Sequence, residues 1–209
     1  MEEKKINNGR ELLKAYCSVI FLITTIALCT TACSIRHVIE KDYPHYLAKN
    51  AGKSNLPKTD KASEYALTPN TQQHSYEFRA ASTGLANLWI VEFGKMLDDT
   101  LMSTDVQKAF GGLQKVSGSS NSSSKSLLIF DLRSYAFKDY GAHLSIKVSL
   151  FRSGQEAFSK TYVQNGRAQA GKMIMWGVFA QKNAVQQSTK LALDEVLRQL
   201  ISDLNKLTT

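Results

Sequence analysis

The strict alternation of residues 143–151 constrains the fold of this chain more than any other feature. Four apolar residues at even positions, from Leu144 to Leu150, are separated by the polar residues Ser145, Lys147 and Ser149. Because successive side chains of a strand point to opposite faces of a sheet, this pattern predicts a strand with one buried face and one solvated face.

Two further strands are predicted on either side of this one. Residues 127–137 begin with an all-apolar run and then alternate, and residues 157–164 mix apolar and polar positions in the same way. The short segments 138–141 and 152–155, which contain Gly141 and Gly154, are typical of turns. The three strands are therefore expected to form an antiparallel meander.

Helices are predicted before and after the strands. From residue 82 to 101 apolar residues recur at spacings of three and four, which predicts an amphipathic helix of about five turns. A second short helix is expected at residues 106–113, and a long one at 184–207, where leucines recur along one face. We expect an α+β domain of two layers, with an antiparallel sheet of three or more strands packed by the first helix and the long C-terminal helix.

The N-terminal segment has the composition of an export signal. Four basic residues precede an apolar run of 14 residues at 15–28, and the small residues Thr31 and Ala32 stand directly before Cys33. This pattern predicts a lipoprotein signal peptide at residues 1–32 and a lipid attached to Cys33. A cut before Cys29 would put the bulky Leu28 at the position that needs a small residue. A retained anchor helix or an ordinary signal peptide would have a similar composition.

The cysteines and the net charge narrow the classes of site that remain. Cys17, Cys29 and Cys33 all lie within this N-terminal segment, so the mature domain has no pair of thiols for a disulfide or a thiolate metal site. The formal net charge is +8, without any block of Lys or Arg. This excess indicates ordinary solubility charge, with attraction to anionic headgroups as the alternative. No motif predicts nucleic-acid binding.

Residues 34–75 contain little that could be buried. They are rich in Lys, Ser, Thr, Asn and Gln, and their one apolar cluster is at residues 43–47. Such a composition rarely offsets the entropy of ordering, so residues 33–75 are predicted to be an acylated cysteine followed by a polar tether, with the globular domain at 76–209. The alternative is that residues 43–47 dock as a short edge strand.

Catalytic and metal-binding patterns are scarce in the sequence. It contains no glycine-rich phosphate loop, no nucleophile motif and no histidine pair at metal-ligand spacing. Asp98 and Asp99 are adjacent, but neighbours on a helix point about 100° apart and do not form an acid/base pair. The four histidines are predicted to lie on the surface or in the tether. We therefore expect no enzyme activity, no cofactor and no metal.

The apolar segment after the strands is the candidate contact surface. Met173, Met175 and Trp176 are predicted to bind a partner, with a place in the core as the alternative. Flanking glycines favour a bent, irregular segment in which Ile174 and Phe179 are buried and Trp176 lies at the rim.

The order of these features resembles two families of bacterial lipoproteins. The spacing of Trp89 and Leu97 is similar to that of the first helix of the ABC-type transport auxiliary lipoproteins, and Lys160-Thr161-Tyr162 resembles the closing strand of YajG-type lipoproteins. Either resemblance implies a non-enzymatic component of the cell envelope. The first family implies a partnership with lipid-transport systems.

The expected protein is an outer-membrane lipoprotein that faces the periplasm. Ser34, rather than Asp, follows the cysteine, which resembles the outer-membrane sorting signal. Its expected partners are the membrane, through Cys33, and an envelope protein of a transport system. The alternative function is a structural subunit of an oligomeric secretion or surface apparatus.

Overall fold

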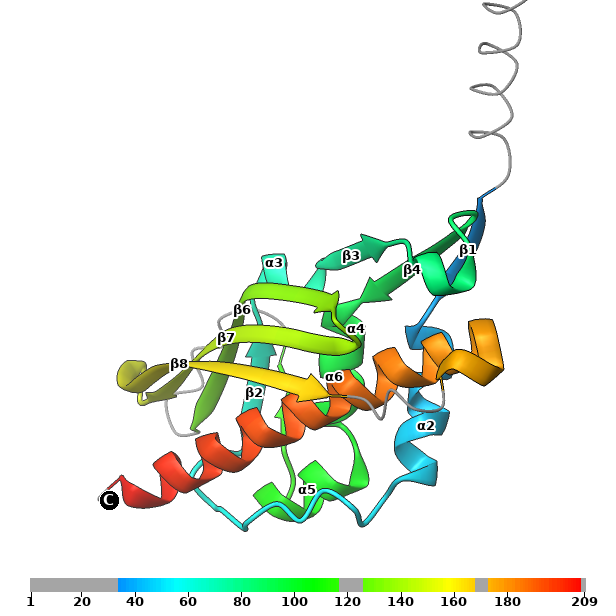
Figure 1. The fold of residues 1–209 in the computed structure, drawn as a ribbon. Helices are drawn as coiled ribbons and strands as arrows, with labels where there is room; N and C mark the ends of the chain where they lie inside the picture. Colours follow the sequence, from blue (N-terminus) through cyan, green and yellow to red (C-terminus); the bar gives the residue numbers. More distant parts are fainter. Residues whose placement is uncertain (1–33, 117–125, 168–172, 208–209) are drawn as a thin grey trace, which may run out of the picture. The chain divides into compact units, whose positions relative to one another are not determined.

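The computed structural model describes residues 34–116, 126–167 and 173–207, with the backbone alone over residues 173–178. The chain divides into two compact units, residues 1–36 and residues 37–209, and the second contains the fold described below. It is an α+β fold with two sheets and a long C-terminal helix that packs along the larger sheet (Figure 1).

Strands and helices alternate in the first half of the chain, whereas the second half is a meander followed by one helix. The strands are β1 (Ile35–Val38), β2 (Glu64–Leu67), β3 (Ser75–Phe78), β4 (Asn87–Glu92), β5 (Gln114–Lys115), β6 (Leu127–Lys138), β7 (Gly141–Arg152) and β8 (Gln155–Arg167). The helices are η1 (Glu40–Asp42), α2 (Tyr43–Lys49), α3 (Pro69–Gln72), η2 (Ala81–Thr83), α4 (Phe93–Leu101), α5 (Thr104–Phe110) and α6 (Met173–Lys206).

The predicted meander is confirmed. Strands β6, β7 and β8 pair antiparallel in a five-stranded sheet of order β5-β2-β6-β7-β8. The even-numbered residues of β7 face the core, where Ile146, Val148 and Leu150 are fully buried. Lys147 and Ser145 lie on the opposite, more polar face, as the alternation predicts.

The sheet is mixed rather than purely antiparallel. Strand β2 pairs parallel with β6, with Tyr65 opposite Leu128, and parallel with β5. A parallel pair needs a long crossover, and here the chain between β2 and β6 contains two strands of the smaller sheet, β3 and β4, together with the helices α3, α4 and α5. The smaller sheet has the strand order β1-β4-β3. Residues 37–38 of β1 belong to the second compact unit, residues 37–209.

The predicted tether at residues 33–75 is wrong from residue 37 onward, because this segment is part of the domain. Ile39, Tyr43 and Tyr65 are fully buried, and Leu47 is 7% exposed. Tyr43 also bonds through its hydroxyl to Thr100 Oγ1 at 3.1 Å. The segment contains few large apolar residues, but most of them are buried in the core or packed against it. Residues 43–47 do dock, as part of helix α2 and not as an edge strand.

The first half of the helix predicted at residues 82–101 is wrong, because residues 87–92 form strand β4 and α4 begins only at Phe93. Trp89, Ile90 and Val91 follow one another and include two β-branched residues, which suits a strand covered on both faces. Strand β3 pairs antiparallel with β4, and Trp89 is fully buried. The short helix expected at 106–113 is present as α5, and Gly111 ends it with a φ of 69°.

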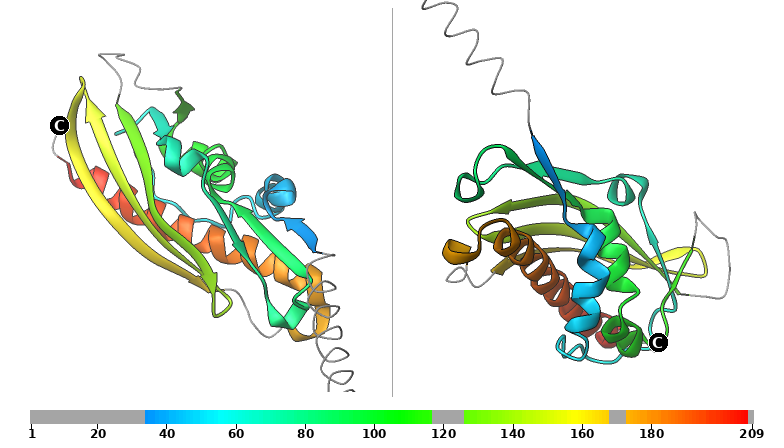
Figure 2. Two further views of the ribbon diagram at one scale, coloured as in Figure 1. Left: turned by 90° about the horizontal axis from the view of Figure 1, so that it is seen from above. Right: turned by 90° about the vertical axis from the view of Figure 1, so that its right-hand side faces the viewer.

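Helix α6 forms the second layer against the large sheet (Figure 2). Its leucines at 193, 197, 200 and 204 are all buried, which confirms the helix predicted at 184–207. The middle of α6 also buries polar residues, some of which bond to residues 39–54 on a second side of the helix. Gln186 Nε2, for example, donates to the carbonyl of Ile39 at 3.2 Å.

Candidate functional site

The residues singled out from the sequence lie at or beyond the edges of the described chain. Cys33 and residues 1–32 lie outside the described residues. Met173, Met175 and Trp176 belong to the first turns of α6, where the backbone alone is described. The irregular segment expected there is wrong, because the helix already begins at Met173. A role of these three residues in partner binding stays a prediction.

The burial expected for Phe179 is also wrong. Its side chain is 78% exposed, the largest value among the exposed apolar side chains of the described residues. Figure 1 shows the N-terminal turns of α6 beyond the end of β8. The sequence also predicts a serine-rich loop at residues 117–124, and this segment lies outside the described residues.

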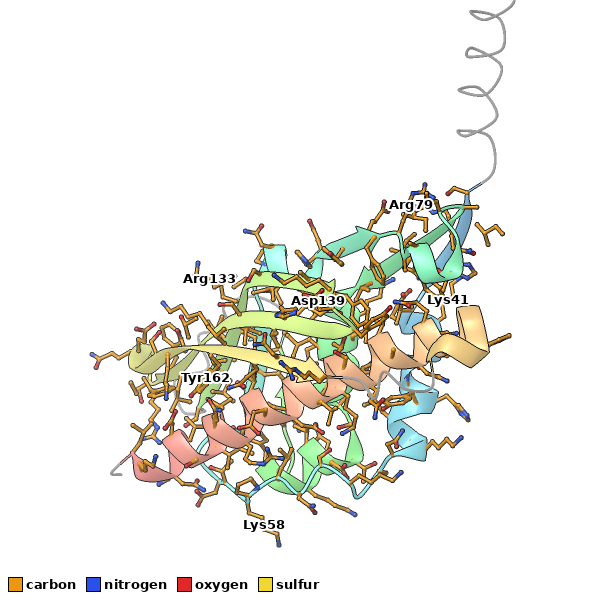
Figure 3. All side chains as sticks on the ribbon, viewed as in Figure 1. Lys41, Lys58, Arg79, Arg133, Asp139 and Tyr162 are labelled. Atoms are coloured by element: carbon orange, nitrogen blue, oxygen red, sulfur yellow. The ribbon has the colours of Figure 1, made fainter. Side chains whose placement is uncertain are left out.

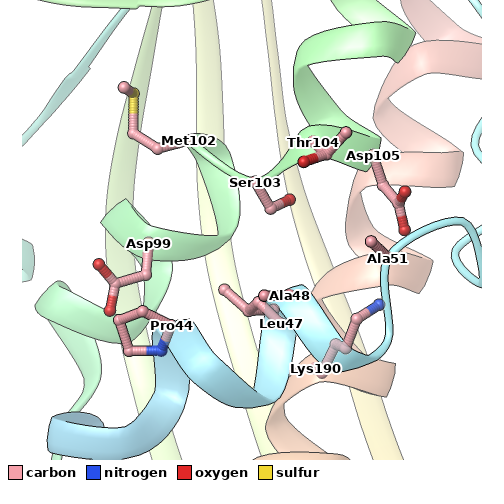
Figure 4. A pocket seen from close by; sticks show the side chains of 10 residues that line it. All are labelled: Pro44, Leu47, Ala48, Ala51, Asp99, Met102, Ser103, Thr104, Asp105 and Lys190. Carbon is pink, nitrogen blue, oxygen red and sulfur yellow. The ribbon is translucent and has the colours of Figure 1, made fainter.

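One pocket, of about 260 Å³, lies where α2, the α4–α5 corner and α6 meet (Figure 4). Pro44 and Leu47 line it from α2, Met102 and Ser103 from the corner, and Lys190 from α6. The lining from α2 is apolar, whereas α6 contributes the basic residue Lys190. This pocket brings together residues from three distant parts of the sequence.

Lys190 is buried together with its ion-pair partner. Lys190 is 7% exposed and Asp194 6%, and their Nζ and Oδ2 atoms are 2.5 Å apart. Lys190 Nζ also donates to Ser54 Oγ at 2.6 Å. Burial raises the pKa of Asp194 above its usual range, although the neighbouring Lys190 opposes that shift. Removal of one partner from such a buried pair is strongly destabilising, because it leaves the other charge buried and unpaired.

Asp105, in α5, binds the backbone of residues 52–54, the same loop that Lys190 contacts through Ser54. Its carboxylate accepts from the backbone N–H of Gly52 at 2.6 Å and from that of Ser54 at 3.3 Å. Burial by itself would raise the pKa of Asp105, but these hydrogen bonds outweigh it and hold the pKa below its usual range. The charged groups at this pocket therefore hold residues 52–54 against α5 and α6.

A second hollow, of about 570 Å³, lies between α2 and the N-terminal part of α6. His45, Tyr46 and Lys49 line it from α2, and Phe179 and Lys182 from α6. The ammonium group of Lys182 forms an ion pair with Asp42, which joins α6 to the end of η1 just before α2. This hollow is open, mixed in polarity and bordered by the exposed ring of Phe179.

The two neighbouring aspartates are separated, as the helix geometry predicts. Asp98 accepts from Tyr65 Oη and from Lys115 Nζ, both at 2.7 Å. Asp99 lines the 260 Å³ pocket on another side of α4. Burial raises the pKa of Asp99, and the charge of Asp98 adds to the effect.

The fold brings a different pair of carboxylates together, and sequence reasoning missed it. Glu40 is 8% exposed, and its pKa is raised by burial first and also by the nearby Glu92. Lys95 lies next to both, 4.0 Å from Glu40 Oε1 and in contact with Glu92. Glu40 and Glu92 are 52 positions apart, so no local spacing could have indicated this cluster.

Three of the four histidines, His37, His74 and His143, are half-buried rather than exposed. His37 stacks on Trp89 with ring centroids 4.5 Å apart, and its Nε2 lies 2.7 Å from Asn87 Oδ1. His74 packs edge-on to Phe93, and burial lowers its pKa. The part of the chain that the structure describes contains no group of three His, Cys, Asp or Glu side chains placed to hold a metal. None of the described helices is both long and apolar enough to span a bilayer.

Comparison with known proteins finds distant likenesses among solved structures. No protein-family model matches the chain, and no curated protein sequence matches it. Among solved structures, the crystal structure of a Xanthomonas campestris protein of the family model DUF330 is similar, with a TM-score of 0.44 and 14% identity. The match covers 71% of this chain and 87% of that chain. This likeness is distant and assigns no function.

Proposed function

We propose that this protein is a lipoprotein of the outer membrane that faces the periplasm and acts as a non-enzymatic binding or assembly component of an envelope transport system. The observation that carries the proposal is the export pattern of residues 1–33, which ends in Thr31, Ala32 and Cys33. Lipid chains on Cys33 would hold the domain at the membrane. Several chains hold stably, whereas a single myristoyl chain binds only marginally.

The arrangement of charged groups supports a binding role over a catalytic one. Lys190 is bonded to Asp194 and Ser54, and Asp105 is bonded to the backbone of residues 52–54. Catalysis would need a base within reach of a nucleophile beside a space for substrate. These groups instead join one part of the domain to another.

Fatty-acid labelling tests the anchor. The parent chain should incorporate labelled palmitate and lose residues 1–32, and Cys33→Ala should do neither. Cys29→Ala is the matched control, because it changes the other cysteine near the site and should leave labelling intact. If Cys33→Ala is still labelled and processed to the same mass, the lipoprotein assignment is wrong.

Affinity purification tests the partnership. The acylated protein, extracted in detergent, should be monomeric when pure and should co-purify with components of a transport system. Recovery with no transport component would contradict this part of the proposal.

A structural subunit of an oligomeric apparatus is the second candidate function, and β8 is the observation that favours it. This strand has 13 residues and lies at the edge of the large sheet, where the described residues provide no further strand. A long edge strand can pair with another copy of the chain. A stable ring of the purified protein, measured by light scattering, would favour this candidate over the first.

A further inference from the structure

The end of the domain that follows Cys33 has two exposed apolar side chains beside basic residues. Leu85, in the turn between β3 and β4, is 70% exposed, and Phe179, near the start of α6, is 78% exposed. These are the two highest values among the exposed large apolar side chains of the described residues. Exposed apolar groups that gather at one end of a molecule often mark a contact site.

A short series of bonds connects the turn to the start of the domain. His37 is the first residue of the compact unit, and its Nε2 lies 2.7 Å from Asn87 Oδ1. Asn87 is two positions after Leu85. The amide of Asn87 also donates to the carbonyl of Thr83, and Trp89 Nε1 donates to Thr83 Oγ1 at 3.2 Å. The turn is therefore held against the segment through which the chain enters the domain.

Covalent geometry limits how far this turn can lie from a lipid on Cys33. His37 is only four positions after Cys33, and an extended chain spans at most about 3.5 Å a residue, or roughly 14 Å in all. The sequence predicts a long spacer between the lipid and the domain, but the folded residues from 37 onward leave none. A domain held so closely must have one end at the headgroup region of the bilayer.

The charges at this end suit an anionic surface. Arg79 lies in the same turn (Figure 3), and its guanidinium donates to the carbonyl of Leu85, which fixes a cation beside the apolar side chain. Lys41, in η1, is exposed. Basic side chains next to exposed apolar ones are typical of surfaces that lie on membranes with anionic lipids.

Phe179 extends the same end of the domain. The element η2, which belongs to the turn, packs against α6, and both Figures 1 and 2 show it beside the N-terminal turns of that helix. The turn and the start of α6 thus form a surface of two elements, with one exposed apolar side chain on each.

We infer that Leu85 and Phe179, with Arg79 beside them, insert into the headgroup region of the membrane that holds Cys33, so that the domain lies directly on an anionic bilayer. This inference rests on the proposed function, since it needs the lipid on Cys33. It adds a second contact and a fixed orientation, and it leaves the β8 edge free for a protein partner.

Fluorescence from position 85 tests the contact. The full chain with Leu85→Cys is labelled with an environment-sensitive dye and reconstituted in vesicles of phosphatidylethanolamine and phosphatidylglycerol. We expect the emission to shift to the blue and to be quenched by a nitroxide on the lipid headgroup. The parent chain, treated identically, shows how much dye reaches other thiols.

Met102→Cys is the matched control. Met102 is also apolar and exposed, at 55%, but it lies at the far end of α4 from the turn. Dye at this position should remain sensitive to aqueous iodide and insensitive to the lipid nitroxide. In phosphatidylcholine vesicles, the shift at position 85 should be smaller, because the attraction of Arg79 to anionic headgroups is lost.

Mass spectrometry of Cys33 in the same samples separates the two proposals. If Cys33 carries lipid and the dye at position 85 stays in water, the membrane contact is wrong and the lipoprotein assignment stands. If the dye at positions 85 and 102 responds alike to the lipid nitroxide, the orientation is wrong. If Cys33 carries no lipid, the proposed function fails and the contact fails with it.

Discussion

Ser188 donates its hydroxyl hydrogen to the carbonyl of Gly166 at 2.6 Å, and this bond holds the middle of α6 against the end of β8. The same hydroxyl accepts from the backbone N–H of Ala142 in β7. A Cβ atom at Gly166 would overlap the carbonyl oxygen of Ser188, so this position needs glycine for close packing.

Gly166→Ala should destabilise the domain by about 3 kcal/mol, since overpacking against a backbone atom leaves helix and strand no easy way to relax. Asn165→Ala is the control, because Asn165 is exposed on the adjacent position of β8 and its loss should change stability by roughly 0.5 kcal/mol or less. Urea denaturation measures both. Equal midpoints would contradict the close approach of α6 to β8.

Lys190→Ala should cost about 3–5 kcal/mol, because it leaves the carboxylate of Asp194 buried without its partner. The double change Lys190→Met with Asp194→Leu removes both charges and should be far milder. Lys206→Ala, at an exposed lysine 3.6 Å from Asp203, should alter stability by about 1 kcal/mol at most. A double variant as unstable as Lys190→Ala would show that the pair is not the cause.

Tyr43→Ala should cost about 3–5 kcal/mol, as expected for the loss of a fully buried aromatic ring. Tyr43→Phe keeps the ring and removes only the bond to Thr100, so about 1 kcal/mol is expected. His45→Ala, two positions further along the same helix and exposed, is the control. If Tyr43→Ala melts with the parent, residues 37–75 would be a tether after all.

Asp105→Asn should weaken the domain most at neutral pH. The hydrogen bonds from Gly52 and Ser54 hold the pKa of Asp105 below its ordinary value of 3.8, so the unfolded state takes up this proton at a higher pH than the folded state. Its stabilisation is therefore complete above that ordinary value and is lost as the pH falls below it. Hydrogen bonds to a charged group contribute about 1.5–3 kcal/mol.

The measurement is urea denaturation from pH 7 down to pH 3 for the parent, Asp105→Asn and the exposed control Asp60→Asn. The difference between the parent and Asp105→Asn should narrow at the acid end, and the control should track the parent throughout. A difference that stays constant with pH would mean that the charge of Asp105 contributes nothing.

Periodicity was most informative where an element packs on one face along its whole length. The alternation in β7 and the leucine spacing in α6 follow directly from such one-sided burial, and both elements lie where the pattern predicts them. Gly111, at a positive φ, likewise ends α5 through a local conformational preference. These elements could be predicted because the signal lies within a few neighbouring residues.

Periodicity failed where burial comes from more than one direction. In β4, Trp89 and Val91 are buried together with the intervening Ile90, so a strand covered on both faces could be read as a helical stripe. In residues 37–75, isolated apolar residues such as Tyr43 and Tyr65 are stabilised only when α4 and β6 are beside them. The neighbouring residues in the sequence do not indicate the surface of α4 and β6 on which they pack.

The sequence by itself determined the meander, the long C-terminal helix and the expectation of an export signal, because each depends on local patterns of polarity. Only the tertiary structure decided that the domain begins at His37, that Lys190 meets Asp194 and Ser54, and that Glu40 lies beside Glu92. Such contacts join positions far apart in the chain, and their free energy arises from desolvation and charge pairing in a site that exists only after folding.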